Sequence, residues 1–197
     1  MKDAAASRLM SEGDEPAVLA TIAVAFAEDP GARWFSPTAR AFLENIVAHA
    51  RVQIHGAMQR GSAYCTDDCT GVALWLPPGA TLNDEALEEA LSQAVPDAIA
   101  GDIAVLEEQA ARYRPEEPHW YLPILAVDPA YQGRGHGGAL LRQGLEACDR
   151  DGAPAYLEAS NPRCVRLYER HGFQSLGTIQ AGSSPAIVPM LRPAAGP

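Results

Sequence analysis

A glycine-rich turn between an apolar segment and a helix-forming segment carries the residues best placed to do chemistry. Residues 122–127 form an apolar run of strand length, and Asp128-Pro129 ends it because proline cannot donate to a sheet. Four glycines then fall within residues 133–138, just before a segment with helical spacing. Glycine lets the backbone curl with its N–H groups inward, and the positive end of the following helix adds to their field. The turn therefore suits an anionic phosphate group, to which Arg134 can add a charged fork.

Dinucleotide binding is one use of such a turn. Residues 133–138 match the G-x-G-x-x-G fingerprint, and Glu158 lies twenty positions after Gly138. However, the dinucleotide turn follows its strand almost directly, whereas five residues separate Val127 from Gly133 here. A dinucleotide domain also needs several further strand–helix units, and only 39 residues follow Glu158. The spacing therefore disfavours NAD as the ligand.

The same turn resembles the coenzyme-binding motif of the GNAT superfamily of acyl-CoA-dependent N-acyltransferases. Gln132, Gly135 and Gly137 fit the family pattern Q/R-x-x-G-x-G/A. Residues 156–161 and 167–173 are similar to the family's fifth strand, next helix and sixth strand, so that the resemblance covers about residues 119–192. It implies an α/β (α+β) fold with a central mixed, mostly antiparallel sheet flanked by helices.

The resemblance also implies roles for individual residues. The turn would hold the pyrophosphate of acetyl-CoA, the acyl donor, and the backbone of the fourth strand would bind the pantetheine arm and the thioester carbonyl. Tyr168 matches the tyrosine that protonates the leaving thiolate. Asn161 matches a residue that bonds the coenzyme arm, and it also suits the N-cap of a helix. The coenzyme-binding residues implied in this way are Leu125, Ala126, Val127, Gln132, Gly133, Arg134, Gly135, His136, Gly137, Gly138 and Asn161.

The general base for the amine is left open by the sequence. Many relatives place a glutamate on the fourth strand, but residues 119–127 contain no carboxylate. His119 or Tyr121 could relay the proton through water, and water alone is a further alternative. Glu158 lies on the neighbouring strand, where a structural hydrogen-bonding role is the simpler interpretation.

The remaining segments supply the frame that must position these residues. Helical spacing predicts a helix over residues 15–27 and a second helix with Ser36 as N-cap and Pro37 at its first position. Trp34 and Phe35 are expected in a loop between them, near the acceptor pocket or over an edge of the core. Further predictions are a short strand at residues 7–10, a hairpin of 63–66 with 72–76, and a helical insertion over 82–113 before the fourth strand. The chain is then expected to form a helix capped by Asn161 that ends near Gly172, and closing strands over 173–179 and 186–191, the last an edge or interrupted strand because of Pro185 and Pro189.

Length and composition indicate an ordinary globular protein with one domain over residues 1–197. The formal charge of −10 and the lack of a Lys/Arg cluster argue against a nucleic-acid surface. The first residues do not resemble a signal peptide and no apolar run has the length of a membrane span, so we expect a cytoplasmic protein. The four cysteines are then expected as reduced thiols. A zinc site at Cys65 and Cys69 would need two more ligands, and no metal is expected.

The prediction from the sequence is thus an N-acetyltransferase that moves acetyl from acetyl-CoA directly to a primary amine, in a ternary complex without a covalent intermediate. A small-molecule amine is the expected acceptor, with peptide N-termini and lysine side chains as alternatives, and a homodimer is left open. The alternative is a non-catalytic acyl-CoA-binding sensor or regulatory module. The missing carboxylate on the fourth strand favours that alternative, and Tyr168 opposes it.

Overall fold

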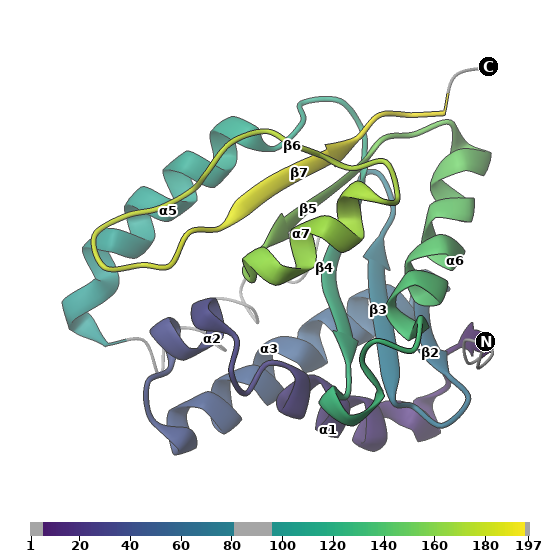
Figure 1. Cartoon of the computed structure of the whole chain (residues 1–197), viewed down its shortest axis with the longest axis horizontal. Coiled ribbons are helices and arrows are strands. Elements are labelled where there is room, and N and C mark those ends of the chain that lie inside the picture. Colours follow the sequence, from purple (N-terminus) through teal and green to yellow (C-terminus); the bar gives the residue numbers. More distant parts are fainter. Residues whose placement is uncertain (1–5, 81–95, 196–197) are drawn as a thin grey trace.

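Seven strands in the order β1-β2-β3-β4-β5-β7-β6 form one sheet in the computed structural model, which describes residues 6–80 and 96–195 (Figure 1). The pairing of β4 with β5 is parallel, and the other described pairs are antiparallel. This confirms the mixed, mostly antiparallel sheet and differs from the parallel sheet of a dinucleotide-binding domain. The strands are β1 Ser7–Leu9, β2 Ala63–Thr66, β3 Gly71–Leu76, β4 Trp120–Val127, β5 Ala155–Ala159, β6 Gln174–Ser175 and β7 Val188–Arg192.

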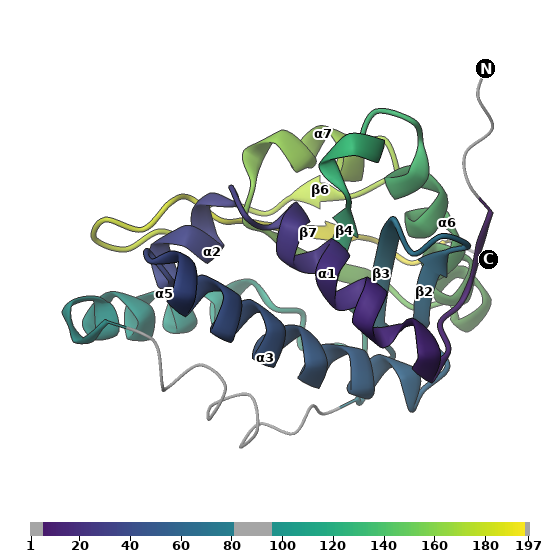
Figure 2. The ribbon, with the colours of Figure 1, turned by 90° about the horizontal axis from the view of Figure 1, so that it is seen from below.

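Helices cover both faces of the sheet (Figures 1 and 2). Against one face, α6 and α7 enclose a core that includes Trp75, Leu141 and Leu157. Against the other face, α1 and α3 enclose a second core that includes Ile22 and Ile54. The helices are α1 Glu15–Ala25, α2 Pro30–Phe35, α3 Ala39–Met58, α5 Ala100–Tyr113, α6 His136–Asp151 and α7 Pro162–Glu169, with 3-10 turns at Glu12–Asp14, Asp97–Ile99 and Pro129–Tyr131. None of these described helices is both long and apolar enough to cross a membrane.

A β-bulge in β4 separates this strand from β5. Leu74 pairs with Ile124, but Leu76 pairs with Tyr121, so two residues of β4, Leu122 and Pro123, oppose one residue of β3. The parallel pairing with β5 involves Trp120 and Tyr121 and stops at the bulge, which contains Pro123, a residue without an N–H to donate. Beyond this point β4 and β5 diverge, and a gap opens between them in the middle of the sheet.

The insertion between β3 and β4 contains α5, as predicted, while residues 81–95 lie outside the described part of the chain. The Gln109 side chain of α5 both donates to the carbonyl of Gln180 and accepts from its N–H, each at 2.9 Å. The indole N–H of Trp34 donates to the hydroxyl of Ser183 at 3.1 Å. The insertion and the segment around Trp34 therefore both fasten the loop that precedes β7.

Two local predictions on the N-terminal side are wrong. Residues 30–35 form the short helix α2 and not a loop, because Asp29 caps it by accepting from the N–H of Ala32 at 3.0 Å. The next helix, α3, begins two residues later than predicted, with Thr38 as its N-cap. Ser36 is instead an acceptor for the side-chain amide of Asn45 at 2.7 Å.

The C-terminal strands are shorter than predicted, and β7 lies between β5 and β6 rather than at the edge of the sheet. Pro189 is compatible with this position because its carbonyl accepts from the N–H of Leu176. The N–H and C=O of one residue point to the same side of a strand, so the missing N–H also faces β6, and the pairing with β5 is retained. The predicted interruption is present. Before β7 begins, the pairing on its β6 side is continued only by a single bridge between Ile179 and Ile187 within the described residues.

Candidate active site

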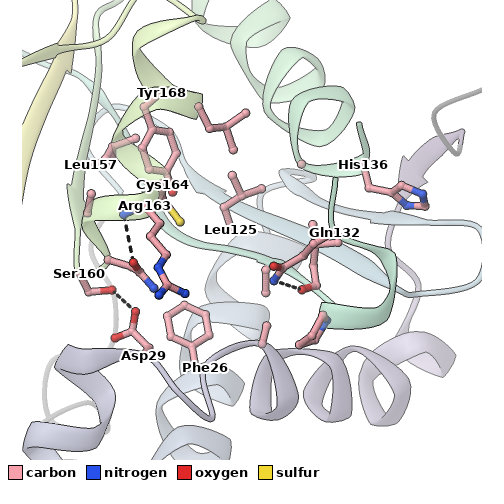
Figure 3. Close-up of a pocket in the computed structure, with 18 of the residues that line it drawn as sticks. Phe26, Asp29, Leu125, Gln132, His136, Leu157, Ser160, Arg163, Cys164 and Tyr168 are labelled. Carbon is pink, nitrogen blue, oxygen red and sulfur yellow. Dashed lines mark hydrogen bonds between the residues drawn. The ribbon is translucent and has the colours of Figure 1, made fainter. Parts of the chain in front are cut away.

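A cavity of about 1230 Å³ occupies the gap where β4 and β5 diverge. The end of α1, β4, the glycine turn, the end of β5 and α7 all contribute to its walls (Figure 3). Its position, at an interruption of the sheet with helix α6 starting at one end, is typical of a ligand site. The cavity thus brings together the glycine turn, the fourth strand, Asn161 and Tyr168, as the resemblance implied.

The glycine turn forms a row of free backbone donors. Gly133 and Gly135 have φ values of +73° and +91°, which side-chain-bearing residues rarely adopt, and Gly135 is the N-cap of α6. After Gln132, the next backbone N–H that has an acceptor is that of Ala139, which donates to the carbonyl of Gly135. Among the described residues, the N–H groups from 133 to 138 have no acceptor. The start of α6 adds a positive field, and such a cradle binds phosphate.

Gln132 and His136 line the cavity, and the side chains of this turn also make contacts within the protein. The amide nitrogen of Gln132 donates to the carbonyl of Val127 at 3.1 Å and so ties the turn to β4. The Arg134 guanidinium donates to the carbonyl of Ala130 at 2.8 Å and lies over the Tyr131 ring, outside the cavity lining. His136 is buried, and its ring points away from the other labelled cavity residues (Figure 3). Gln132 and Arg134 therefore shape the turn through their contacts with its backbone, while Nδ1 of the buried His136 has no hydrogen-bond partner among the described residues.

The pairing register decides which backbone groups of β4 face the gap. The N–H of Asp128 donates to the carbonyl of Thr70 in β3 at 2.9 Å. Alternation along an antiparallel pair then directs Ala126 toward β3, and Leu125 and Val127 away from it. Of the three residues predicted to bind the coenzyme arm, Leu125 and Val127 offer backbone groups to the cavity. Ala126 also lines the cavity, but its backbone N–H and C=O are directed toward β3.

Tyr168 projects from α7 into the cavity, toward Cys164 and Leu125 (Figure 3). It is 8% exposed, its ring packs edge-on against Phe173, and its hydroxyl has no hydrogen-bond partner in the described chain. Burial raises the pKa of Tyr168 well above its usual range, with smaller contributions from Cys164 and Asp29. The hydroxyl is therefore protonated at ordinary pH and available to a ligand.

Asn161 and its neighbour Ser160 connect the end of β5 to two other elements. The Asn161 side chain caps α7 by accepting from the N–H of Arg163 at 3.1 Å, as predicted. Ser160 donates to Asp29 at 2.9 Å and so joins β5 to the start of α2 across one side of the cavity (Figure 3). Asp29 was missed in the sequence, although an aspartate before a proline is a recognisable helix start.

The three residues considered as base occupy different surroundings. The His119 ring nitrogen Nδ1 lies 2.8 Å from the carbonyl of Glu117, and His119 does not line the cavity. Burial raises the pKa of Tyr121 well above its usual range, which makes this tyrosine a poor proton acceptor. Glu158 lines the cavity, and its carboxylate accepts from the hydroxyl of Tyr156 at 3.0 Å. Geometry therefore favours Glu158.

A separate cluster contains Cys65 and Cys69, which lie with Asp14 so that their ligand atoms are within 4.8 Å of one another. Arg8 binds both carboxylate oxygens of Asp14, at 2.7 and 2.8 Å. Burial raises the pKa of the Cys65 thiol to about 12, so the thiol form is favoured. None of these residues lines the cavity.

Several proteins similar to this chain are named as acetyltransferases. Residues 96–173 match the sequence profile of the Acetyltransferase (GNAT) family. An uncharacterized N-acetyltransferase of Schizosaccharomyces pombe is 23% identical over 188 residues, which cover 85% of this chain and 74% of that protein. A mycothiol acetyltransferase of Brachybacterium faecium is 42% identical over 57 residues, which cover 27% of this chain and 17% of that protein. The solved structure of histone acetyltransferase HPA2 and related acetyltransferase from Corynebacterium glutamicum matches with a TM-score of 0.73 and 26% identity over 99% of both chains.

Proposed function

We propose that this chain, which belongs to the GNAT superfamily of acetyltransferases, transfers the acetyl group of acetyl-CoA directly to a primary amine of a small molecule. One observation carries the proposal. A single cavity connects a row of free backbone N–H groups to a diverging pair of strands and to a buried, unbonded tyrosine hydroxyl.

The coenzyme would enter with its phosphates at the glycine turn. The N–H groups from 133 to 138 and the start of α6 offer donors and a positive field to a pyrophosphate. Arg163 and Arg170 also line the cavity and add positive charge to it. The pantetheine arm is an extended amide chain, so it can use the backbone groups of Leu125 and the N–H of Val127, which β5 leaves unpaired. The arm would in this way lie between β4 and β5 and bind β4 as a neighbouring strand would.

Chemistry would take place between β4 and Tyr168. A backbone N–H that faces the gap can stabilise the oxyanion formed when the amine attacks, and such a donor contributes roughly 3–4 kcal/mol in other enzymes. The protonated hydroxyl of Tyr168 can donate to the sulfur as the carbon–sulfur bond breaks. The thiolate then leaves as a neutral thiol.

The acceptor would occupy the end of the cavity at α1 and β5. Glu28, Asp29 and Glu158 line the cavity, together with Arg163, and Asp29 is only 6% exposed. Asp29 accepts hydrogen bonds but has no ion-pair partner within the described residues. Carboxylates favour a cationic group nearby, and most primary amines arrive as ammonium ions. These surroundings support an amine acceptor.

Calorimetric titration of the purified protein with acetyl-CoA tests the coenzyme assignment, with NAD as a parallel titration. We expect micromolar binding of acetyl-CoA and no heat from NAD, because the cradle is followed by the gap in the sheet and not by a second nucleotide site. Binding of NAD alone, or of neither compound, would contradict the proposal.

A further inference from the structure

Glu158 is anchored through one of its two carboxylate oxygens. The Tyr156 hydroxyl donates to Oε1 at 3.0 Å, and the Arg114 Nη2 atom lies 3.5 Å from the same oxygen. Within the described residues, the second oxygen, Oε2, has no partner. Because Glu158 lines the cavity, one oxygen is held by the protein while the other remains available to a ligand.

Aromatic packing holds the anchor in place. Tyr156 is fully buried, its ring stacks on Tyr121 with centroids 6.1 Å apart, and the His119 ring packs edge-on against it at 5.8 Å. The Arg114 guanidinium lies over the Tyr121 ring, 5.7 Å from its centroid. Burial, together with the neighbouring Glu158, raises the pKa of Tyr156 well above its usual range. Its hydroxyl is therefore protonated at ordinary pH and donates to Glu158.

We infer that Glu158 accepts the proton of the acceptor amine and that Tyr156 is the residue that positions it. The inference rests on the proposed function and names a base on β5, since β4 has no carboxylate. The salt bridge with Arg114 is half exposed and long, and pairs of this kind contribute little to stability. Arg114 therefore supplies charge compensation, and Tyr156 supplies the geometry.

The proton balance of the step is as follows. An ammonium ion gives one proton to Oε2 of Glu158 and becomes a free amine, whose nitrogen forms a bond to the thioester carbon. The carbon–sulfur bond then breaks, and the sulfur takes the proton of the Tyr168 hydroxyl. The second proton lost by the nitrogen restores the Tyr168 hydroxyl. One proton leaves Glu158 for solvent in each turnover, and the products are an amide and a thiol.

Glu158→Gln tests the base directly. At neutral pH we expect kcat/KM for the amine to fall by roughly 10²–10⁴-fold, with the affinity for acetyl-CoA unchanged. The deficit should shrink as the pH approaches about 10, because an amine that arrives deprotonated needs no base.

The control is Glu169→Gln, which changes an exposed glutamate of α7 outside the cavity lining. A wild-type protein with no amine-dependent turnover would overturn the proposed function. An active wild type with a Glu158→Gln deficit below twofold, or a deficit that does not change with pH, would overturn this inference alone.

Tyr156→Phe tests the positioning role, because phenylalanine keeps the buried ring and removes only the hydroxyl. We expect kcat to fall by about tenfold, since a carboxylate freed at Oε1 can rotate away from the amine. The double variant Tyr156→Phe/Glu158→Gln should be no slower than Glu158→Gln, because the hydroxyl acts only through the carboxylate. Additive losses would show that Tyr156 supports the fold independently of Glu158 and would overturn the positioning role.

Discussion

Gly135→Val is expected to lower the affinity for acetyl-CoA by roughly a hundredfold. Gly135 has a φ of +91° as the N-cap of α6, and a β-branched residue there is strained by about 1–3 kcal/mol. Relief of this strain would rotate the backbone and turn N–H groups of the cradle away from the phosphates. Each hydrogen bond to a charged group that is lost contributes roughly 1.5–3 kcal/mol. Calorimetric titration of the variant with acetyl-CoA measures the effect.

Gly61→Val is the matched control for this prediction. Gly61 also has a positive φ, +64°, and a Cβ at this position would meet no atom within 4 Å. It precedes β2 and does not line the cavity. We expect this variant to lose a similar amount of stability and to bind acetyl-CoA like the wild type. If Gly135→Val bound acetyl-CoA with unchanged affinity, the glycine turn would not be the phosphate cradle.

Tyr168→Phe is expected to reduce kcat by roughly 10²–10³-fold while the affinity for acetyl-CoA stays within about twofold. The substitution removes the hydroxyl that would protonate the thiolate and keeps the ring, which packs against Phe173. That hydroxyl has no hydrogen-bond partner in the described chain, so its loss leaves no protein group unsatisfied. Thiol release at saturating acetyl-CoA and amine measures kcat, and titration with acetyl-CoA measures the affinity.

Tyr64→Phe provides the control for Tyr168. Both tyrosines are 8% exposed, both belong to the core on the α6 side of the sheet, and burial raises the pKa of both. Tyr64 does not line the cavity. Removal of the Tyr64 hydroxyl should therefore leave turnover unchanged. If Tyr168→Phe kept the wild-type rate, another group would be the acid.

The motif region could be predicted from the sequence because its structure depends on local residue types. Glycines at residues 133 and 135 adopt positive φ values, and Asn161 caps α7 before a proline, as their residue types indicate. Both features need only a few neighbouring residues. The strand–turn–helix order around the cavity was therefore predictable from the sequence.

The same local rule also shows where sequence reasoning fails. A capping residue followed by proline marks a helix start at Asn161-Pro162 and at Asp29-Pro30, but not at Ser36-Pro37. Thr38 offers a competing cap two residues later, and Ser36 is bound by Asn45 from the next helix. The outcome depends on a tertiary contact, which spacing alone does not reveal.

The site itself depends on pairing register, which one sequence does not fix. After the bulge at Leu122 and Pro123, the backbone groups of Leu125 and Val127 are directed toward the gap, and those of Ala126 are directed toward β3. Pro123 within an apolar strand was the available signal for this bulge. The contact between Tyr156 and Glu158 follows from their positions two apart on β5, which places both side chains on one face. That Glu158 also lines the cavity depends on the tertiary structure, which the sequence alone does not reveal.

Amine-dependent release of CoA is the measurement that tests the central claim most directly. The purified protein would be incubated with acetyl-CoA and a panel of primary amines, with matched tertiary amines as controls, and both free thiol and acetylated amine would be quantified. We expect at least one primary amine to give thiol and acetylated product in equal amounts, and the tertiary amines to give neither. Tight binding of acetyl-CoA without acetylation of any amine would contradict the account and would identify a non-catalytic acyl-CoA-binding module.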